Sequence, residues 1–288
     1  VPFRFTDERE GRRLSTDALR ERIEASILSL TPVTETLKPE AVRPQVYRAE
    51  LEGAVVLRSR IVVPLSGSEA AQANAALAAA ALNGLRVDTG ETLSFNQTVG
   101  LRTSEAGYQA AEEPAYGQNV SGVGGGVCQV STALYRLALL GGMEIGERNA
   151  AVYPVDYCDV GQEAAVSDQG LDLKIVNSTG MPVFLTARVY ADGDGQTMEL
   201  QLIGLELDES YTLASETETI APPEEPIYVR DSEGRYAAYS DERIPVGEPM
   251  PGYRVTVRLI NETDEKIVSQ DEYDAIPQII YVGVSQRP

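Results

Sequence analysis

The pattern of apolar and polar positions predicts a helix near residue 70 that packs in the core. Alanine, the residue with the best helix propensity, fills most of the run from about Glu69 to Leu82. Ser66-Gly67-Ser68 precedes this run as a typical cap, and Asn83-Gly84 follows it as a typical end. Because the side chains are small, we expect the helix to pack closely against a sheet or another helix.

A second buried helix is predicted after a run of glycines. Val130, Leu134 and Leu137 recur at three- and four-residue steps, and Gly141-Gly142 ends the pattern. This spacing places the apolar side chains on one face of the helix.

The start of the chain shows a weaker pattern. Leu19, Ile23 and Ile27 share one face of a predicted helix that Ser15-Thr16-Asp17 would cap. Residues 33–48 contain prolines and suit an extended connector, whereas residues 48–63 are predicted to form a strand or hairpin.

After about residue 164 the alternation has period two, which is typical of strands. Turn residues separate the apolar segments at regular intervals, which predicts an antiparallel meander and then, beyond an acidic linker, a second β unit. The predicted strands are Ala164–Ser167, Leu171–Val176, Val183–Tyr190 and Met198–Ile203 in the meander, and Ile227–Val229, Tyr253–Leu259 and Lys266–Gln270 in the second unit. The predicted fold class is α+β: a core of antiparallel strands with two helices, followed by a small all-β C-terminal domain.

Net charge and hydropathy exclude some classes of binding partner for this chain. The chain has 288 residues, of which 44 are acidic and 24 basic, for a net charge of −20. This balance argues against a nucleic-acid partner and against direct binding to an anionic bilayer. No apolar run approaches the roughly 20 residues that span a membrane, and residues 1–30 lack the signal-peptide pattern. We expect no membrane insertion by these residues and a signal or anchor upstream of Val1; the oligomeric state stays open.

Two cysteines and no histidine limit the chemistry. Without histidine, neither a Ser-His-Asp triad nor a Cys-His pair is available, and two cysteines alone do not make the usual zinc site. No metal and no cofactor are therefore predicted. Cys128 and Cys158 are able to form one disulfide in an oxidising compartment if the fold brings them together.

Cys128 stands where the glycine-rich loop enters the second helix. Gly122, Gly124, Gly125 and Gly126 lie just before it. The unpaired amides and the dipole at a helix N-terminus favour the thiolate over the thiol. The stretch is compatible with a nucleophile, with an anion site, or with a tight turn beside a buried thiol. The glycines themselves permit either a tight turn or the close approach of a ligand.

Several separated motifs in this chain resemble the VanW family. They occur in the family's order within residues 91–176. These motifs are Glu91–Asn96, Val99-Gly100, Arg102-Thr103, Gly107-Tyr108, Gly124–Ser131, Leu134-Tyr135, Tyr153–Val155 and Leu171–Lys174. The resemblance covers about residues 49–205. Residues 1–48 resemble a connector and the tail of a peptidoglycan-binding segment, and residues 206–288 a linker and a five-glycine-like wall-associated β domain.

The resemblance implies an extracellular or cell-envelope protein of a bacterium, with peptidoglycan stem peptides as its partner. Some members of the family are implicated as L,D-transpeptidases, which form 3-3 cross-links through the motif cysteine. Cys128 would then be a nucleophile that forms a thioester with a stem peptide. From residue type and motif position we further expect Arg102, Asn149 and Asp172 to act in catalysis, and Gly125, Gly126, Gln129 and Ser131 in substrate or oxyanion binding.

One departure from the family pattern bears on this function. Family members commonly carry histidines just after the Glu-Arg pair that aligns with Glu147-Arg148, whereas this chain has Asn149 and Ala151 there. An alternative function is therefore a non-catalytic peptidoglycan-binding or scaffolding module associated with glycopeptide resistance. In a third alternative, a disulfide between Cys128 and Cys158 inactivates or regulates the nucleophile.

Overall fold

The computed structural model describes residues 5–286 apart from residues 15, 33, 35, 37, 116, 117 and 194. The chain divides into two compact units, Val1–Val55 and Val56–Pro288, which we describe separately. The domain boundaries predicted at 48/49 and 205/206 stay predictions.

The first unit is small and carries two helices within its described residues. β1 (Gly11–Arg13) pairs antiparallel with β2 (Glu40–Val42), and α1 (Thr16–Ser29) lies between them in the sequence. α1 confirms the helix predicted around Ile23 and Ile27, although both side chains are exposed. The predicted cap residue Ser15 lies outside the described residues.

The strand or hairpin predicted from residue 48 is wrong for its first seven residues. Arg48–Ala54 form α2, and the strand β3 runs from Val55 to Pro64. Two local contacts favour the helix. The Glu50 carboxylate accepts a hydrogen bond from the Tyr47 amide at 3.3 Å, and Arg48 pairs with Glu52 one turn later at 2.8 Å.

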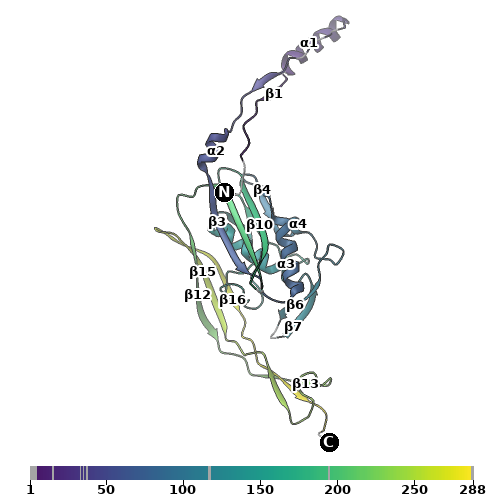
Figure 1. Cartoon of the computed structure of the whole chain (residues 1–288), viewed down its shortest axis with the longest axis vertical. Helices are drawn as coiled ribbons and strands as arrows, with labels where there is room; N and C mark the ends of the chain where they lie inside the picture. Colours follow the sequence, from purple (N-terminus) through teal and green to yellow (C-terminus); the bar gives the residue numbers. More distant parts are fainter. Residues whose placement is uncertain are drawn as a thin grey trace. The chain divides into compact units, whose positions relative to one another are not determined.

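A four-stranded sheet forms one side of the larger unit's core. Its strand order is β3, β11 (Gly195–Leu205), β10 (Val183–Asp192) and β4 (Leu85–Val87). The helix α3 (Glu69–Leu82) packs on β10, as Figure 1 shows, and also contacts α5 (Val127–Leu140).

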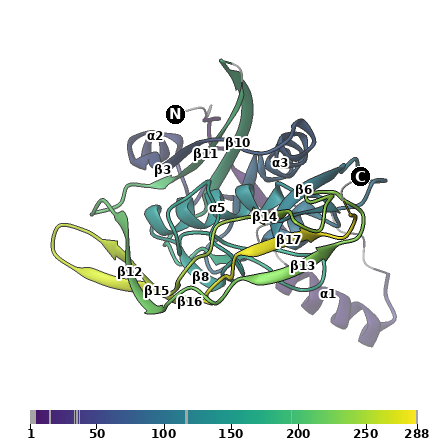
Figure 2. The ribbon, with the colours of Figure 1, turned by 90° about the horizontal axis from the view of Figure 1, so that it is seen from below.

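Both core helices were predicted within a few residues. α3 begins after Ser68, whose hydroxyl accepts a hydrogen bond from the Ala71 amide at 3.3 Å, and it buries the alanine face. α5 buries Val130, Leu134 and Leu137, and it ends at Gly141. α5 contacts β11 on one side and β8 (Glu144–Glu147) on the other, as Figure 2 shows.

The predicted meander is only partly correct, and its first predicted strand, Ala164–Ser167, is wrong because these residues form no strand. β10 and β11 form an antiparallel hairpin, but the preceding strand β9 (Lys174–Val176) belongs to another sheet. There it pairs with β8 and with β5 (Thr92–Ser94), which leads directly into the short helix α4 (Phe95–Val99). Strand pairing depends on partners distant in sequence, which alternation alone does not identify.

The glycine-rich loop follows a hairpin of β6 (Ala110–Ala115) and β7 (Gln118–Val123). β7 ends one residue before Gly124, so the hairpin delivers the chain to the start of α5.

The C-terminal residues are all β, as predicted. One sheet has the order β12 (Thr212–Ala221), β15 (Gly252–Ile260), β16 (Glu265–Tyr273), and the acidic linker thus includes a strand. The other has the order β13 (Ile227–Asp231), β17 (Ile279–Gly283), β14 (Arg243–Val246), with β13 parallel to β17. With the helices of the core, this arrangement confirms the α+β class.

Candidate functional site

The glycine-rich loop is shaped by close packing against the protein itself. Gly126, the cap of α5, has a φ of 98°, and an added Cβ would lie 2.3 Å from the Ala71 carbonyl oxygen of α3. Gly124 has a φ of 94°, and an added Cβ would lie 2.7 Å from the Arg102 Cβ. Glycine is required at both positions by backbone conformation and by space. The sequence left open whether these glycines form a tight turn or let a ligand come close. In the structure, the groups that come close to Gly126 and Gly124 are α3 and Arg102.

Asn74 of α3 fixes the same loop from the other side. Its side chain is 1% exposed and donates to the carbonyl oxygens of Gln109 and Gly125, at 2.9 Å each. Its Oδ1 accepts a hydrogen bond from the Gln109 amide at 2.8 Å. A buried amide with three such bonds holds the loop in one conformation.

Cys128 lies in the first turn of α5 and is partly exposed. Its Sγ donates to the carbonyl oxygen of Val166 at 3.6 Å. The predicted thiol at a helix N-terminus is therefore present, at a place where the dipole favours negative charge on sulfur.

Cys158 occupies a different environment. Both cysteines are thiols in the structure. Burial raises the pKa of the Cys158 thiol to about 12, and the nearby Glu163 carboxylate acts in the same direction. Burial also raises the pKa of Tyr157, and both thiols add to that shift, so the phenol lies electrostatically close to each of them. Tyr157 thus stays protonated beside Cys128.

Two predicted substrate-binding residues make contacts that organise the loop. The Gln129 Oε1 accepts a hydrogen bond from the Ser66 amide at 2.8 Å, and its Nε2 donates to the Ser66 carbonyl at 3.2 Å. Ser131 donates to the carbonyl oxygens of Ala164 at 2.6 Å and Cys128 at 3.1 Å. Both side chains therefore have protein partners.

Arg102 is buried and bound on two sides. Its Nη1 contacts Asp168 Oδ1 at 2.5 Å and its Nη2 contacts Asn96 Oδ1 at 2.6 Å. Its backbone amide donates to the second Asp168 oxygen at 3.0 Å, and the guanidinium lies 5.7 Å from the centre of the Phe95 ring. These contacts fix Arg102 as a support of the loop at Gly124.

The Asn149 side chain contacts Asp172 at its backbone carbonyl, not at its carboxylate. Asp172 accepts hydrogen bonds from Ser94 Oγ at 2.6 Å and from the Asn96 amide at 2.9 Å. Asn149 Nδ2 donates to the Asp172 carbonyl at 3.0 Å and to Glu147 Oε1 at 3.5 Å. Lys174, which pairs with Glu147 at 2.7 Å, lowers the pKa of that carboxyl, so Glu147 acts as an acceptor.

Residues 164–168 connect the separate parts of the site. The Ala164 carbonyl contacts Ser131, the Ala165 amide bonds to the Asn149 carbonyl at 2.8 Å, and the Val166 carbonyl contacts Cys128. Asp168 in turn pairs with Arg102. The structure thus gathers Cys128, Ser131, Asn149 and Arg102 around one short segment, and Asp172 follows it four residues later.

Sequence reasoning missed Asp168, Tyr157 and Glu163. Tyr157 stands next to Cys158, so its position offered a signal, whereas Asp168 lies in a polar stretch with no motif of its own. Glu163 is fully buried and accepts hydrogen bonds from Arg148 and from the Tyr273 hydroxyl of β16.

The described residues offer neither a cluster of metal-binding side chains nor a membrane-spanning helix. Among these residues no group of three or more histidine, cysteine or carboxylate side chains is placed to hold a metal ion. Their helices include none with the length and hydropathy needed to cross a bilayer.

Comparison with known solved structures finds one match. The crystal structure of HP0197-G5 is matched over 26% of this chain and 99% of its own, with 15% identity and a TM-score of 0.14. At that score the match carries no conclusion, and the five-glycine-like domain stays a prediction.

Comparison with known sequences identifies the central domain. The family described as VanW like protein matches residues 70–201. The uncharacterized protein YoaR of Bacillus subtilis is 36% identical over 125 residues, which are 43% of this chain and 41% of YoaR. The vancomycin B-type resistance protein VanW of Enterococcus faecalis is 34% identical over 111 residues, 37% of this chain and 40% of that protein. The chain thus spans about two fifths of each relative's length, and its residues 70–201 form a domain that is similar to the VanW family.

Proposed function

We propose that this protein acts in the bacterial cell envelope on peptidoglycan, and that Cys128 is the nucleophile of an acyl transfer between stem peptides. The observation that carries the proposal is the partly exposed Cys128 thiol in the first turn of α5. The relative named for vancomycin resistance supports the envelope setting.

The proposed reaction has two steps. The Cys128 sulfur, as thiolate, attacks the carbonyl carbon that precedes the terminal D-Ala of a tetrapeptide stem. The C–N bond breaks, D-Ala leaves with a proton on its amine, and a thioester remains. The amine of a second stem then attacks the thioester, a new C–N bond forms, the C–S bond breaks, and the thiolate returns. Solvent water gives the proton that D-Ala takes in the first step and accepts the proton that the attacking amine loses in the second.

The glycine-rich loop holds the start of α5, and with it Cys128, in place for this reaction. Gly124 and Gly126 pack against Arg102 and Ala71, and Asn74 holds Gly125, so the first turn of α5 is rigid. Preorganised amides at a helix N-terminus stabilise an oxyanion because they need not reorient as charge develops. We assign the oxyanion site to the backbone near Gly125 and Gly126, and a supporting role to the paired Arg102.

A second candidate function is a peptidoglycan-binding module without catalysis. It is favoured by the contacts of Arg102, Asn149 and Asp172, each of which bonds to the protein rather than to the Cys128 thiol in the contacts described above. The absence of histidine from the chain points the same way, because imidazole is the commonest general base.

Incubation with disaccharide-tetrapeptides, followed by mass spectrometry, tests both functions. The enzyme is expected to release D-Ala and to form a cross-linked dimer, Cys128→Ala is expected to abolish both products, and the matched control Cys158→Ser is expected to retain them. Absence of product from the wild type, with equal retention of wild type and Cys128→Ala on purified sacculi, would establish the binding module instead. Failure to bind sacculi and to react would overturn both.

A further inference from the structure

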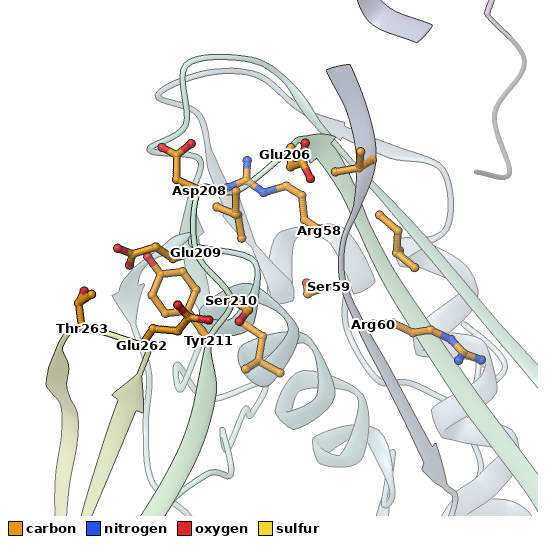
Figure 3. A pocket seen from close by; sticks show the side chains of 14 residues that line it. Arg58, Ser59, Arg60, Glu206, Asp208, Glu209, Ser210, Tyr211, Glu262 and Thr263 are labelled. Carbon is orange, nitrogen blue, oxygen red and sulfur yellow. The ribbon is translucent and has the colours of Figure 1, made fainter. Parts of the chain in front are cut away.

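A pocket lies far from the Cys128 thiol. It has a volume of about 730 Å³ and is formed by β3, residues 206–211 and the turn at Glu262-Thr263 (Figure 3). Leu140 at the end of α5 also lines it, roughly 18 Å of helix away from Cys128. Its size lies within the range of pockets that bind small ligands.

The side chain of Arg58, on β3, lines this pocket and packs against two glycines, Gly142 and Gly204. A Cβ on Gly204 would lie 3.0 Å from the Arg58 Cδ, and a Cβ on Gly142 would lie 3.3 Å from its Nη2. A side chain at either glycine would therefore crowd the arginine. The two glycines leave the space in which the guanidinium lies.

The Arg58 guanidinium has no counter-ion among the described residues. Its Nε is buried without a hydrogen-bond partner, and burial lowers the pKa of the group. Arg60, two residues along the same strand, instead contacts Glu199 at 2.6 Å. Because arginine stays charged in proteins, a half-buried guanidinium whose buried Nε has no partner is costly for the protein alone. An anionic group on a ligand would remove that cost.

Carboxylates surround the cation without pairing with it. Glu206, Asp208, Glu209 and Glu262 line the same pocket, and Figure 3 shows Glu206 and Asp208 on either side of the Arg58 side chain. A ligand with several negative charges would be repelled by this rim. A ligand that carries one carboxylate and an ammonium group would satisfy both the arginine and the acids.

We propose that this pocket binds a short peptide with a free carboxylate and a free amine, the carboxylate on Arg58 and the ammonium on the acidic rim. The site is separate from Cys128, and its ligand binding does not depend on the reaction proposed there.

Calorimetric titration with lysyl-alanyl-alanine tests the ligand class. The free peptide is expected to bind, while its C-terminal amide and its doubly N-acetylated form are each expected to bind at least about tenfold more weakly, because the amide lacks the carboxylate and the acetylated form lacks both ammonium groups. Sodium phosphate is expected not to bind. Equal affinity for the amide, strong phosphate binding or no binding of the free peptide would overturn the proposal.

Variants test the assigned residue. Arg58→Gln is expected to weaken peptide binding at least about tenfold and to leave the melting temperature unchanged or raised, since it removes an unpaired cation. The matched control Arg86→Gln, on the opposite edge strand β4, and Cys128→Ala are expected to bind the peptide as the wild type does. Unchanged binding by Arg58→Gln, or a loss shared by Arg86→Gln, would refute the site. If Arg58→Gln does not fold, the comparison of free peptide and amide on the wild type still decides.

Discussion

At the scale of single residues, both cysteines are partly exposed, but they lie in different surroundings. Cys128 is partly exposed on the first turn of α5, whereas burial and Glu163 raise the pKa of Cys158 to about 12. Since the thiolate is the reactive form, Cys158 is an inert thiol at neutral pH. Tyr157 lies between the two environments and stays protonated.

This difference predicts selective alkylation by iodoacetamide. At pH 8 only about one Cys158 thiol in ten thousand is ionised, so Cys128 is expected to be modified first and Cys158 only after unfolding or as the pH approaches 12. Peptide mapping by mass spectrometry measures the order. Cys128→Ser is expected to abolish the fast phase, and Cys158→Ser to leave it unchanged.

The same titration checks the disulfide hypothesis. Unreduced protein in denaturant is expected to show two thiols per chain. Modification of Cys158 before Cys128, or the absence of titratable thiols without reductant, would contradict the assignment of Cys128 as the reactive group.

The sequence predicted the place of Cys128 more readily than the roles of its neighbours. A glycine run before an apolar helical pattern is a local signal, and it located the thiol at the start of α5. The contacts of Arg102 depend on Asp168, which is distant in sequence, and those of Asp172 depend on Ser94. Residue type therefore suggested that Arg102 and Asp172 contact the substrate, whereas in the fold these side chains contact other residues of the protein.

At the scale of elements, the start of α5 depends on its contact with α3. Gly126 and Ala71 approach so closely that no side chain fits between them, and Asn74 of α3 bonds to Gly125. The small residues of α3 are thus needed for the helix to approach the loop. This explains the alanine-rich composition better than helix propensity alone does.

Replacing Gly126 by alanine tests how much the contact between α5 and α3 contributes to stability. Gly126→Ala is expected to lose about 2–5 kcal/mol of unfolding free energy, from the left-handed backbone and from overpacking against the Ala71 carbonyl. Gly84→Ala is the matched control, because Gly84 has a φ of 82° but open space around its Cβ position. Its loss is expected to be about 1–2 kcal/mol. Urea denaturation compares the two, and equal losses would show that packing against α3 contributes little.

Element prediction succeeded where the signal was local. The cap at Ser68 and the end at Asn83 fixed α3, and glycines fixed the end of α5. β9 was assigned to the wrong sheet, because its partners β5 and β8 are distant in sequence and all three strands are short. α2 is an exception, because it was missed although the pairs of Glu50 with Tyr47 and of Arg48 with Glu52 that favour its helix are local.

At the scale of the larger unit, a buried ionic network joins the core to the C-terminal sheet. Arg148 donates to the Glu163 carbonyl at 2.7 Å and the Gly161 carbonyl at 2.9 Å, and it pairs with Asp271 of β16 at 2.5 Å. Its guanidinium lies 5.5 Å from the centre of the Tyr135 ring of α5. The Glu-Arg motif that aligns with the family thus carries a structural arginine in this chain.

This network predicts that the core and the β12-β15-β16 sheet unfold together. Arg148→Met leaves Glu163 and Asp271 without their shared cation, and breaking a buried pair in this way typically costs about 3–5 kcal/mol. The control Arg254→Met removes an exposed pair with Glu272 on the same sheet, and its effect is expected to be within measurement error. Urea denaturation followed by circular dichroism should show one transition for the wild type and a lower midpoint for Arg148→Met. Two separate transitions in the wild type, or equal midpoints for both variants, would mean that Arg148 does not couple the sheet to the domain that carries Cys128.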